Sequence, residues 1–277
     1  MGTFFDLSIS QTLVSDPNNY FLHAVSGFGL VIPYITFALV GGLLVRITLD
    51  NKEQKTWLKV LLIIFGIAIS LAGVYFAAHD NFTVNGLNKD GVLFDFLGYG
   101  NAVLLCGFTF FLGYIGGKDN MNKKLWIAIL VISFSIIISQ VFGTVILKSL
   151  FHRPRFRSLG GELEFQPWYM PYGDYEKHIT DVITKEEFKS FPSGHASVSA
   201  LMMFYAIVIP PLFPKYLAKK LSMPLFFVGL AYFIFVALVR ILAGAHFLSD
   251  VSFGGLLTIA LSIIAITIID KYKLLEN

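Results

Sequence analysis

Long apolar stretches separated by short polar connections dominate this chain. A helix needs about 20 apolar residues to cross a hydrocarbon core, and seven stretches reach that length. They are residues 24–46, 56–78, 94–116, 125–149, 194–214, 222–243 and 248–269. Most of their faces are apolar, as in helices that meet lipid or other apolar helices. The pattern therefore predicts an all-α fold, a polytopic membrane helix bundle with about seven transmembrane helices.

One polar segment interrupts this pattern. Residues 150–193 are polar and aromatic, and they form a far longer connection than any other between the predicted spans. Loops of this length usually carry function or are disordered. The aromatic residues and prolines in it favour an ordered cap on the membrane. Residues 1–23 carry apolar positions that suit a short helix along the interface.

Lysines and arginines mark alternate connections. The connections after the first, third and fifth spans and the C-terminal tail hold Arg46, Lys52, Lys55, Lys59, Lys118, Lys123, Lys124, Lys215, Lys219, Lys220, Lys271 and Lys273. The N-terminus has no such residue, and residues 79–93 have only Lys89. Basic loops favour the cytoplasmic side. We therefore expect a cytoplasmic C-terminus, with the N-terminus and residues 150–193 outside.

The composition narrows the partners. Hydrophobic residues make up 56% of the chain and charged residues 14%, which indicates an integral membrane protein in contact with the lipid bilayer. A net charge of +3, without a basic stripe, argues against nucleic acid. The single cysteine, Cys106, excludes an intrachain disulfide and a cysteine zinc site. No obligatory protein partner is predicted.

The candidate catalytic and phosphate-binding residues lie at three helix ends on the predicted outer side. Ionisable residues at such positions are costly in a membrane and tend to mark function. The groups are Lys148 with Arg155, Pro192-Ser193-Gly194-His195, and Arg240 with His246 and Asp250.

These residue types suit a phosphate. A helix that begins at Ser193 and Gly194 offers backbone N–H groups and the positive end of its dipole to an anion. Arg155 and Arg240 can bind phosphate oxygens with planar guanidinium groups, and Lys148 adds a point charge.

Two histidines complete a set for phosphoryl transfer. His246 and Asp250 are four positions apart and share a face if the helix begins by residue 246. The carboxylate could then hold one ring nitrogen and leave the other to attack phosphorus. His195 beside the anion site is the natural proton donor to the leaving alkoxide. No metal and no cofactor are required.

The order and spacing of these residues resemble the type-2 phosphatidic acid phosphatase superfamily. Its motifs are a Lys with Arg-Pro seven residues on, Pro-Ser-Gly-His, and Ser-Arg followed by a His and an Asp. Lys148 and Arg155 are seven apart, Pro192 to His195 match in full, and Arg240, His246 and Asp250 keep the third spacing. The likeness covers about residues 125–270.

The resemblance implies a six-helix phosphatase core with its site near the outer surface. It implies His246 as nucleophile, Asp250 as its partner and His195 as general acid. Lys148, Arg155, Arg240, Ser193 and Gly194 would hold phosphate. Within one membrane domain over 1–277, residues 1–93 would supply N-terminal spans including an added helix. Residues 94–277 would supply the catalytic core with its extracytoplasmic cap.

Two departures leave alternatives open. Phe156 stands where a proline is expected after Arg155, whereas Arg153 is followed by Pro154. A shifted reading would place Arg153 in the phosphate site, although the spacing favours Arg155. Arg157 is a further candidate headgroup contact. Val239 replaces the serine before Arg240, which removes one hydroxyl from the predicted phosphate site.

The expected activity is metal-independent hydrolysis of a lipid phosphomonoester or diphosphate at the outer leaflet, through a phosphohistidine. The expected location is the bacterial cytoplasmic membrane. Candidate substrates are an isoprenoid diphosphate such as undecaprenyl diphosphate, phosphatidylglycerol phosphate and phosphatidic acid. A lipid phosphotransferase with another acceptor remains an alternative. A membrane transporter is a further one, although the charges cluster at one face rather than along a route through the bilayer.

Overall fold

All regular elements in the described part of the chain are helices. The structure is a computed structural model that describes residues 2–16, 31–83, 92–117, 141–160, 163–208 and 215–272, together with residues 19, 21, 22, 25 and 210. Within these residues the one β contact is an isolated bridge between Gly160 and Leu163. The predicted all-α fold is confirmed. The chain divides into two compact units, which are described separately.

Among the described residues, three helices are long and apolar enough to cross a membrane. They are Thr56–Tyr75 within α4 (Thr56–Thr83), Lys220–Leu242 within α10 (Lys215–Leu242), and α11 (Leu248–Lys271). A shorter apolar stretch, Ala102–Gly116, lies in α5 (Val92–Gly116). These helices are consistent with a membrane bundle. Most of the predicted span 125–149 lies outside the described residues, so the number of spans stays a prediction.

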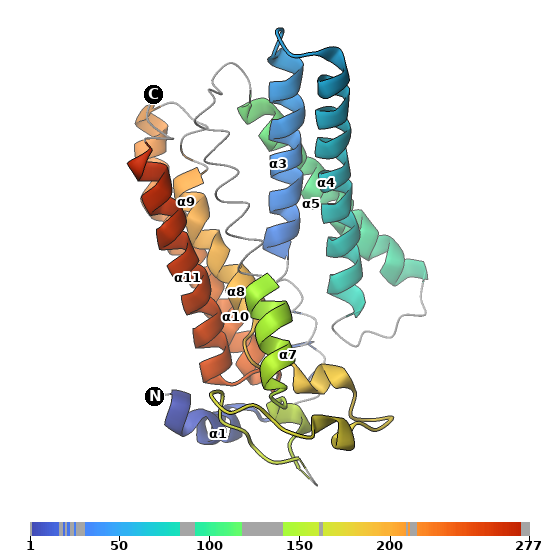
Figure 1. The fold of residues 1–277 in the computed structure, drawn as a ribbon, viewed down its shortest axis with the longest axis vertical. Helices are drawn as coiled ribbons and strands as arrows, with labels where there is room; N and C mark the ends of the chain where they lie inside the picture. The colour runs from blue at the N-terminus through green and yellow to red at the C-terminus, as the bar shows by residue number, and fades with distance from the viewer. Residues whose placement is uncertain are drawn as a thin grey trace. The chain divides into compact units, whose positions relative to one another are not determined.

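One unit comprises residues 30–133, 203–227 and 265–277. In it, α3 (Val31–Asp50) packs against both α4 and α5, and Figure 1 shows α3 beside α4. Glycine makes this close approach possible: a Cβ added at Gly73 of α4 would lie 2.6 Å from the Tyr34 carbonyl oxygen of α3. Small residues let membrane helices approach closely enough for their backbones to pack. Cys106 of α5 is buried in the core of this unit.

Two helix boundaries differ from the sequence prediction. Helix α3 continues to Asp50 rather than ending near residue 46, and Arg46 Nε donates to Asp50 Oδ2 at 2.8 Å one turn later. Such i,i+4 pairs stabilise a helix. Helix α10 begins at Lys215, so the basic connection predicted before residue 222 is helical.

The other unit comprises residues 1–29, 134–202 and 228–264, and it contains every candidate site residue. A π-helical turn, Val141–Leu147, leads directly into α7 (Lys148–Phe151). Helix α8 (Gly194–Ala200) continues through a 3₁₀ turn, Leu201–Phe204, into α9 (Tyr205–Val208). The segment between α7 and α8, which we call the cap, is residues 152–193.

The described part of the cap is ordered by backbone hydrogen bonds. Arg155 N–H donates to the Glu187 carbonyl at 2.9 Å, and Ser190 N–H donates to the Arg153 carbonyl at 3.0 Å. Short 3₁₀ turns lie at Phe156–Ser158, Tyr175–His178 and Lys185–Phe188. These bonds tie the beginning of the cap to its end, next to α8.

The N-terminal residues form the expected short helix. Helix α1 (Gly2–Leu13) buries Asp6 and Ser10, which are one turn apart, and leaves the side chains of Phe5 and Leu13 exposed. Figure 1 shows α1 close to the beginning of α11. Its protein-facing side is therefore polar.

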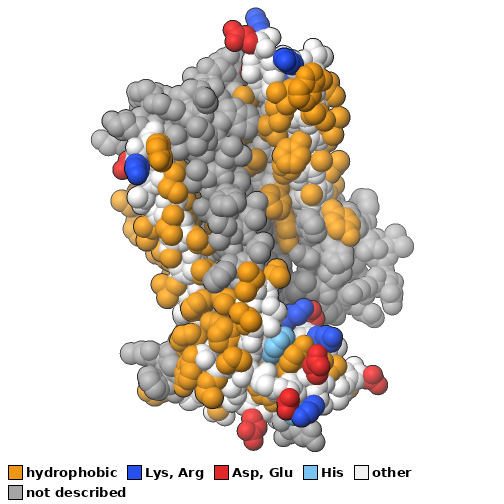
Figure 2. Space-filling view, viewed as in Figure 1, with side chains coloured by type: hydrophobic (Ala, Val, Ile, Leu, Met, Phe, Trp, Pro, Cys, Tyr) orange, Lys and Arg blue, Asp and Glu red, His pale blue; other side chains and the backbone are white. Residues whose placement is uncertain are grey.

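The helix surfaces are apolar. Figure 2 shows hydrophobic side chains along the long helices, and charged side chains gathered at helix ends and on the cap. On α4 the exposed large residues are Trp57, Val60, Leu61, Ile64, Phe65, Ile67, Leu71 and Tyr75. An exposed apolar surface of this extent suits contact with lipid rather than water.

Candidate active site

The turn between α10 and α11 places His246. Gly244 adopts a φ of +60°, a conformation that glycine tolerates best, and its carbonyl accepts the Arg157 N–H at 2.9 Å. The N–H of His246 donates to the Arg240 carbonyl at 3.3 Å. The turn is therefore fixed both to the last residues of α10 and to the cap.

The ring of His246 is oriented by a backbone carbonyl. Nδ1 lies 2.7 Å from the carbonyl oxygen of Ser190. Because a carbonyl can only accept, Nδ1 carries the hydrogen in this bond. In the neutral imidazole, Nε2 is then left with a lone pair. The arrangement gives His246 a nucleophilic nitrogen.

This contact corrects the hydrogen bond that we predicted from Asp250. Its Oδ2 lies 3.8 Å from His246 Nδ1, beyond hydrogen-bonding distance. The carboxylate instead accepts from Phe247 N–H at 2.8 Å and from Ser190 Oγ and Arg153 Nη1, each at 2.5 Å. Asp250 thus contacts His246 indirectly, through Ser190, and its Oδ2 lies 3.8 Å from Nδ1.

Electrostatics favour the neutral form of His246. Burial holds the pKa of its imidazole well below the usual value, and the charges of Arg240, Lys148 and Arg155 lower the pKa further. The hydrogen bond to Ser190 opposes this shift. At neutral pH His246 is therefore in the form that can attack phosphorus.

Helix α8 places His195 close to α11. Ser193 is the N-cap, and its hydroxyl accepts the Ala196 N–H at 3.3 Å. Ser193 N–H donates to the Asp250 carbonyl at 3.0 Å. A Cβ added at Gly254 would lie 2.5 Å from the Ser193 carbonyl oxygen, so this close contact of α8 with α11 requires glycine.

Positive charge surrounds both histidines. Lys148, Arg155 and Arg240 each interact electrostatically with the imidazoles of His195 and His246. Burial lowers the pKa of Arg155 to about 10, helped by the charge of Arg157, so Arg155 stays protonated at neutral pH. The structure thus brings together five of the predicted residues, from α7, the cap, α8, α10 and the turn before α11.

Buried polar atoms of Arg155 and His195 in this cluster are unsatisfied by the described residues. Among the described residues, Arg155 Nε and His195 Nε2 have no hydrogen-bond partner. A buried polar group without a partner costs about 1–3 kcal/mol. An anion bound between these side chains would supply acceptors for them.

Arg153 occupies a different environment from Arg155. Its guanidinium donates from Nε to the Gln166 carbonyl at 2.8 Å and from Nη1 to Asp250 at 2.5 Å. It also lies over the Phe247 ring, 4.1 Å from the centroid. With its side chain fully enclosed, Arg153 is a structural cation, which argues against the shifted reading that placed it in the phosphate site.

Arg157 is also held by protein. Its guanidinium binds the Glu187 carboxylate at 2.9 and 2.6 Å, and Ser158 Oγ donates to the same carboxylate. Burial alone would raise the pKa of Glu187, but the hydrogen bond and charge of Arg157 lower it to about 2, aided by Arg155 and Ser158. Arg157 therefore joins the beginning of the cap to Glu187 near its end, and its guanidinium is not directed at a ligand.

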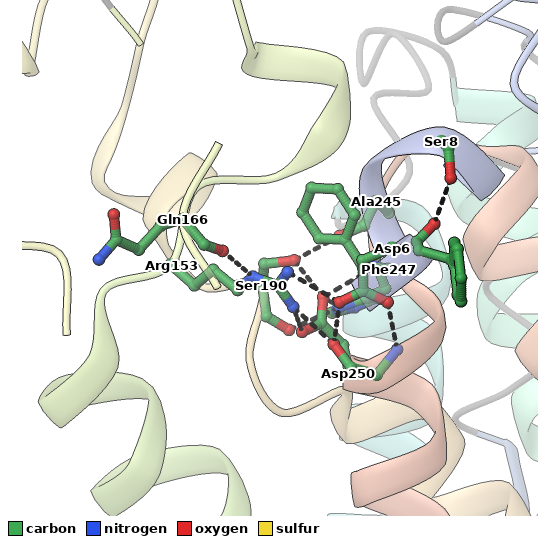
Figure 3. A network of polar contacts seen from close by, with 11 residues as sticks. Asp6, Ser8, Arg153, Gln166, Ser190, Ala245, Phe247 and Asp250 are labelled. Atoms are coloured by element: carbon green, nitrogen blue, oxygen red, sulfur yellow. Dashed lines mark hydrogen bonds and ion pairs between the residues drawn. The ribbon is translucent and has the colours of Figure 1, made fainter. Parts of the chain in front are cut away.

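Sequence reasoning missed four residues that build this site. Ser190 orients His246, Glu187 binds Arg157, and Asp6 and Ser249 bind Arg153. Figure 3 shows Asp6, Arg153, Ser190 and Asp250 in one network. None belongs to a recognisable motif, and their contacts span long separations in the sequence. The one available signal was an acidic residue within an otherwise uncharged N-terminal helix.

In the residues that the structure describes, no three His, Cys, Asp or Glu side chains cluster as metal ligands would. The expectation of a reaction without metal stays a prediction. The arrangement offers two imidazoles, one of them with its Nδ1 held by a carbonyl, and three basic side chains. This is the chemistry that transfer of a phosphoryl group requires.

The comparisons with known proteins agree with this chemistry. A family model described as the PAP2 superfamily matches residues 103–273, more than half of the chain. The matched range includes every candidate site residue and excludes α1, α3 and α4. Comparison with curated proteins and with solved structures found no match.

Proposed function

Because this chain belongs to the PAP2 superfamily, we propose that it is a metal-independent phosphatase of lipid phosphates. Members of the superfamily are phosphatases, so the chain is a phosphoric ester hydrolase at that level. Apolar helices long enough to span a bilayer support membrane association. The lipid substrate and the outer-leaflet site belong to the proposal.

One observation carries the proposed mechanism: the Ser190 carbonyl holds Nδ1 of His246 at 2.7 Å, which leaves Nε2 to attack. The cations Lys148, Arg155 and Arg240 act on this imidazole and on that of His195. A phosphate bound by these cations would therefore lie between the two rings. Electrostatic stabilisation of the transferred group is the largest contribution that such a site makes.

In the first step, His246 Nε2 attacks phosphorus and forms an N–P bond while the P–O bond to the lipid breaks. His195 takes up a proton once the negatively charged phosphate offsets the surrounding cations, and it gives this proton to the leaving lipid oxygen, so a lipid alcohol or, from a diphosphate, a lipid monophosphate departs. The carboxylate of Asp250, 3.8 Å from Nδ1, stabilises the positive charge that develops on His246.

In the second step, neutral His195 takes a proton from water, whose oxygen attacks phosphorus. The N–P bond breaks, inorganic phosphate leaves, and both histidines return to their starting forms. The three cations hold the phosphoryl oxygens in both steps. The side chains of this chain thus supply every proton transfer in the proposed cycle.

The substrate class follows from the location of the site. The charges lie at helix ends, beside a cap that is predicted to face outside. A substrate with its phosphate at the membrane surface and its chain in the bilayer would fit that position. We propose undecaprenyl diphosphate, phosphatidylglycerol phosphate and phosphatidic acid as the lipids to test, in a bacterial cytoplasmic membrane.

A lipid phosphotransferase is the second candidate, since its phosphohistidine would be resolved by an alcohol and the same residues would serve. Isotope exchange separates the two. If water resolves the phosphohistidine, the enzyme also runs this step backwards and replaces the oxygens of [¹⁸O]phosphate with oxygen from water. A strict transferase and a transporter would leave the label in place.

The test uses detergent-purified wild type and His246→Asn, with a chelator present. The asparagine amide can still donate to the Ser190 carbonyl, so the variant removes the nucleophile while keeping this contact. We expect wild type to release phosphate from at least one lipid and to exchange ¹⁸O, and His246→Asn to do neither. The ranking of lipids then identifies the substrate class.

His152→Asn is the matched control, because His152 stacks on Tyr175 in the cap, with ring centroids 3.8 Å apart, and has no role in the proposed reaction. It should retain wild-type rates. Hydrolysis by His246→Asn at the wild-type rate would rule out the phosphohistidine. Release of phosphate that stops with the chelator and returns with a divalent metal would rule out the metal-independent reaction.

A further inference from the structure

Helix α1 contributes the carboxylate of Asp6 to the network of contacts that leads to the proposed nucleophile, His246. Asp6 is 1% exposed, and its carboxylate accepts from Ser249 N–H at 2.9 Å, from Ser249 Oγ and from Arg153 Nη2 at 3.0 Å. Ser249 is the second residue of α11. Asp6 therefore binds the first turn of the helix that carries Asp250. Asp6 and Ser249 are 243 positions apart in the chain.

Arg153 joins Asp6 to Asp250. Its Nη2 binds Asp6, and its Nη1 binds both Asp250 Oδ1 at 2.5 Å and Ser249 Oγ at 2.8 Å. Figure 3 shows Arg153 in one network with Asp6 and Asp250. The pairing is enclosed, since none of the three side chains has appreciable exposed surface. Buried pairs of this kind are sensitive to the loss of one partner.

The network keeps one unit of negative charge, because two carboxylates share one guanidinium. Asp250 in turn accepts from Ser190, whose carbonyl orients His246. A continuous chain of contacts thus runs from Asp6 through Arg153 and Asp250 to Ser190 and His246. Asp6 lies outside the residues that the family model matches.

We propose that Asp6 is a positioning residue for the phosphoryl-transfer reaction, acting on His246 through Arg153 and Asp250. The inference rests on the proposed function. Asp6 fixes the guanidinium and the beginning of α11, so that the Asp250 carboxylate and Ser190 hold the ring in its attacking orientation. It also maintains negative charge behind the ring, where positive charge develops during attack.

Removing the negative charge of Asp6 should have a predictable effect on the reaction at His246. Replacing Asp6 with asparagine keeps an oxygen acceptor for Ser249 but removes one negative charge. Positive charge on His246 then becomes less favourable, so phosphorylation slows, while the cations that bind phosphate are unaffected. Among the described residues, the charged and titratable groups that face His246 are Lys148 of α7, Arg155 of the cap, His195 of α8, Arg240 of α10 and Asp250 of α11.

The experiment measures ¹⁸O exchange of inorganic phosphate by full-length wild type, Asp6→Asn and Asp6→Ala in detergent. Isothermal titration with inorganic phosphate counts competent sites per molecule and gives their Kd. We expect the exchange rate per site to fall about tenfold to a hundredfold in both variants. The Kd and the number of sites should stay at the wild-type values.

A pH profile provides the readout that a purely structural role would not change. In Asp6→Asn, the acid limb of the exchange rate should move to lower pH than in wild type, because the imidazolium form of His246 loses a favourable charge. Asp16→Asn is the matched control: it removes an exposed acidic side chain just after α1. Its rate and profile should be those of wild type.

Wild-type exchange per site in both Asp6 variants would overturn the inference. So would a loss explained entirely by fewer phosphate-binding sites, since α1 would then serve only folding. Failure of the proposed function is distinguishable, because wild type itself would then exchange no label. If wild type exchanges, His246→Asn does not and the Asp6 variants behave as wild type, only the role of Asp6 is wrong.

Discussion

Three arginines at alternate positions of the cap have three different environments. Arg153 is enclosed between two carboxylates, and Arg157 binds Glu187. Arg155 is buried with its Nε unsatisfied among the described residues, beside the two histidines. Residue type alone therefore does not assign phosphate binding. Arg155, which has a buried donor that protein does not satisfy, is the one of the three suited to an anion.

The role of His195 leads to a prediction about leaving groups. If His195 protonates the departing oxygen, His195→Asn should slow hydrolysis of an alkyl phosphate by about 10²–10⁴-fold. The aryl oxide that leaves an aryl phosphate is a stable anion and needs little protonation. The rate of hydrolysis of an aryl phosphate should therefore fall much less. The measurement compares kcat/KM for a lipid phosphate and for p-nitrophenyl phosphate, with His152→Asn as control. Equal losses on both substrates would contradict general acid catalysis by His195.

At the scale of elements, the site depends on helix ends that meet at glycines. Gly254 lets the start of α8 lie against α11, and Gly244 provides the left-handed turn between α10 and α11. Backbone hydrogen bonds also hold the cap: Arg155 N–H donates to the Glu187 carbonyl within it, and Arg157 N–H donates to the Gly244 carbonyl in the turn. Helix packing and the cap thus position groups from distant parts of the sequence.

An ion pair within the cap should make the stability of the protein depend on pH. Because the pKa of Glu187 is lowered to about 2 from an ordinary 4.5, its pairing with Arg157 contributes its full stability above pH 4.5. That contribution is lost as the pH falls from 4.5 towards 2. We expect Glu187→Gln to lower the free energy of unfolding by about 1–2 kcal/mol near neutral pH. Unfolding curves of wild type and variant in detergent should converge over that acid range.

Glu186→Gln provides the control for the cap. Glu186 pairs with Lys189 at an exposed position, where an ion pair contributes about 0–1 kcal/mol. A difference between wild type and Glu187→Gln that stays constant down to pH 2 would mean that the Glu187 charge does not stabilise the cap.

At the scale of the whole molecule, orientation in the membrane decides which leaflet supplies the substrate. The basic connections predict that the cap faces outside and the α3–α4 connection faces the cytoplasm. The chain suits a labelling test because its one cysteine, Cys106, is buried and can be replaced by alanine. Val182 in the cap is 87% exposed, and Lys52 lies exposed in the α3–α4 connection.

In a Cys106→Ala background, Val182→Cys should react with a membrane-impermeant maleimide on intact cells. Lys52→Cys should react only after the membrane is permeabilised, because the reagent cannot otherwise reach the cytoplasm. Unsubstituted protein with buried Cys106 measures background labelling. The reverse pattern would place the active site on the cytoplasmic side and would remove the argument for outer-leaflet lipids.

The sequence by itself determined the features that are local or periodic. Hydropathy predicted apolar helices because each helix satisfies its own backbone and exposes its side chains to lipid. The spacing of Lys148, His195, Arg240 and His246 identified the superfamily, and the structure brings their side chains into one cluster. Their catalytic roles remain proposals.

Only the tertiary structure decided which partner each charged group takes. Asp250 was expected to hold the His246 ring, yet its oxygens bind Arg153, Ser190 and the Phe247 N–H, and the Ser190 carbonyl holds the ring. Asp6 meets Ser249 across 243 positions. A buried carboxylate takes the donors that packing brings within reach, and neither helical period nor motif spacing specifies donors from distant segments.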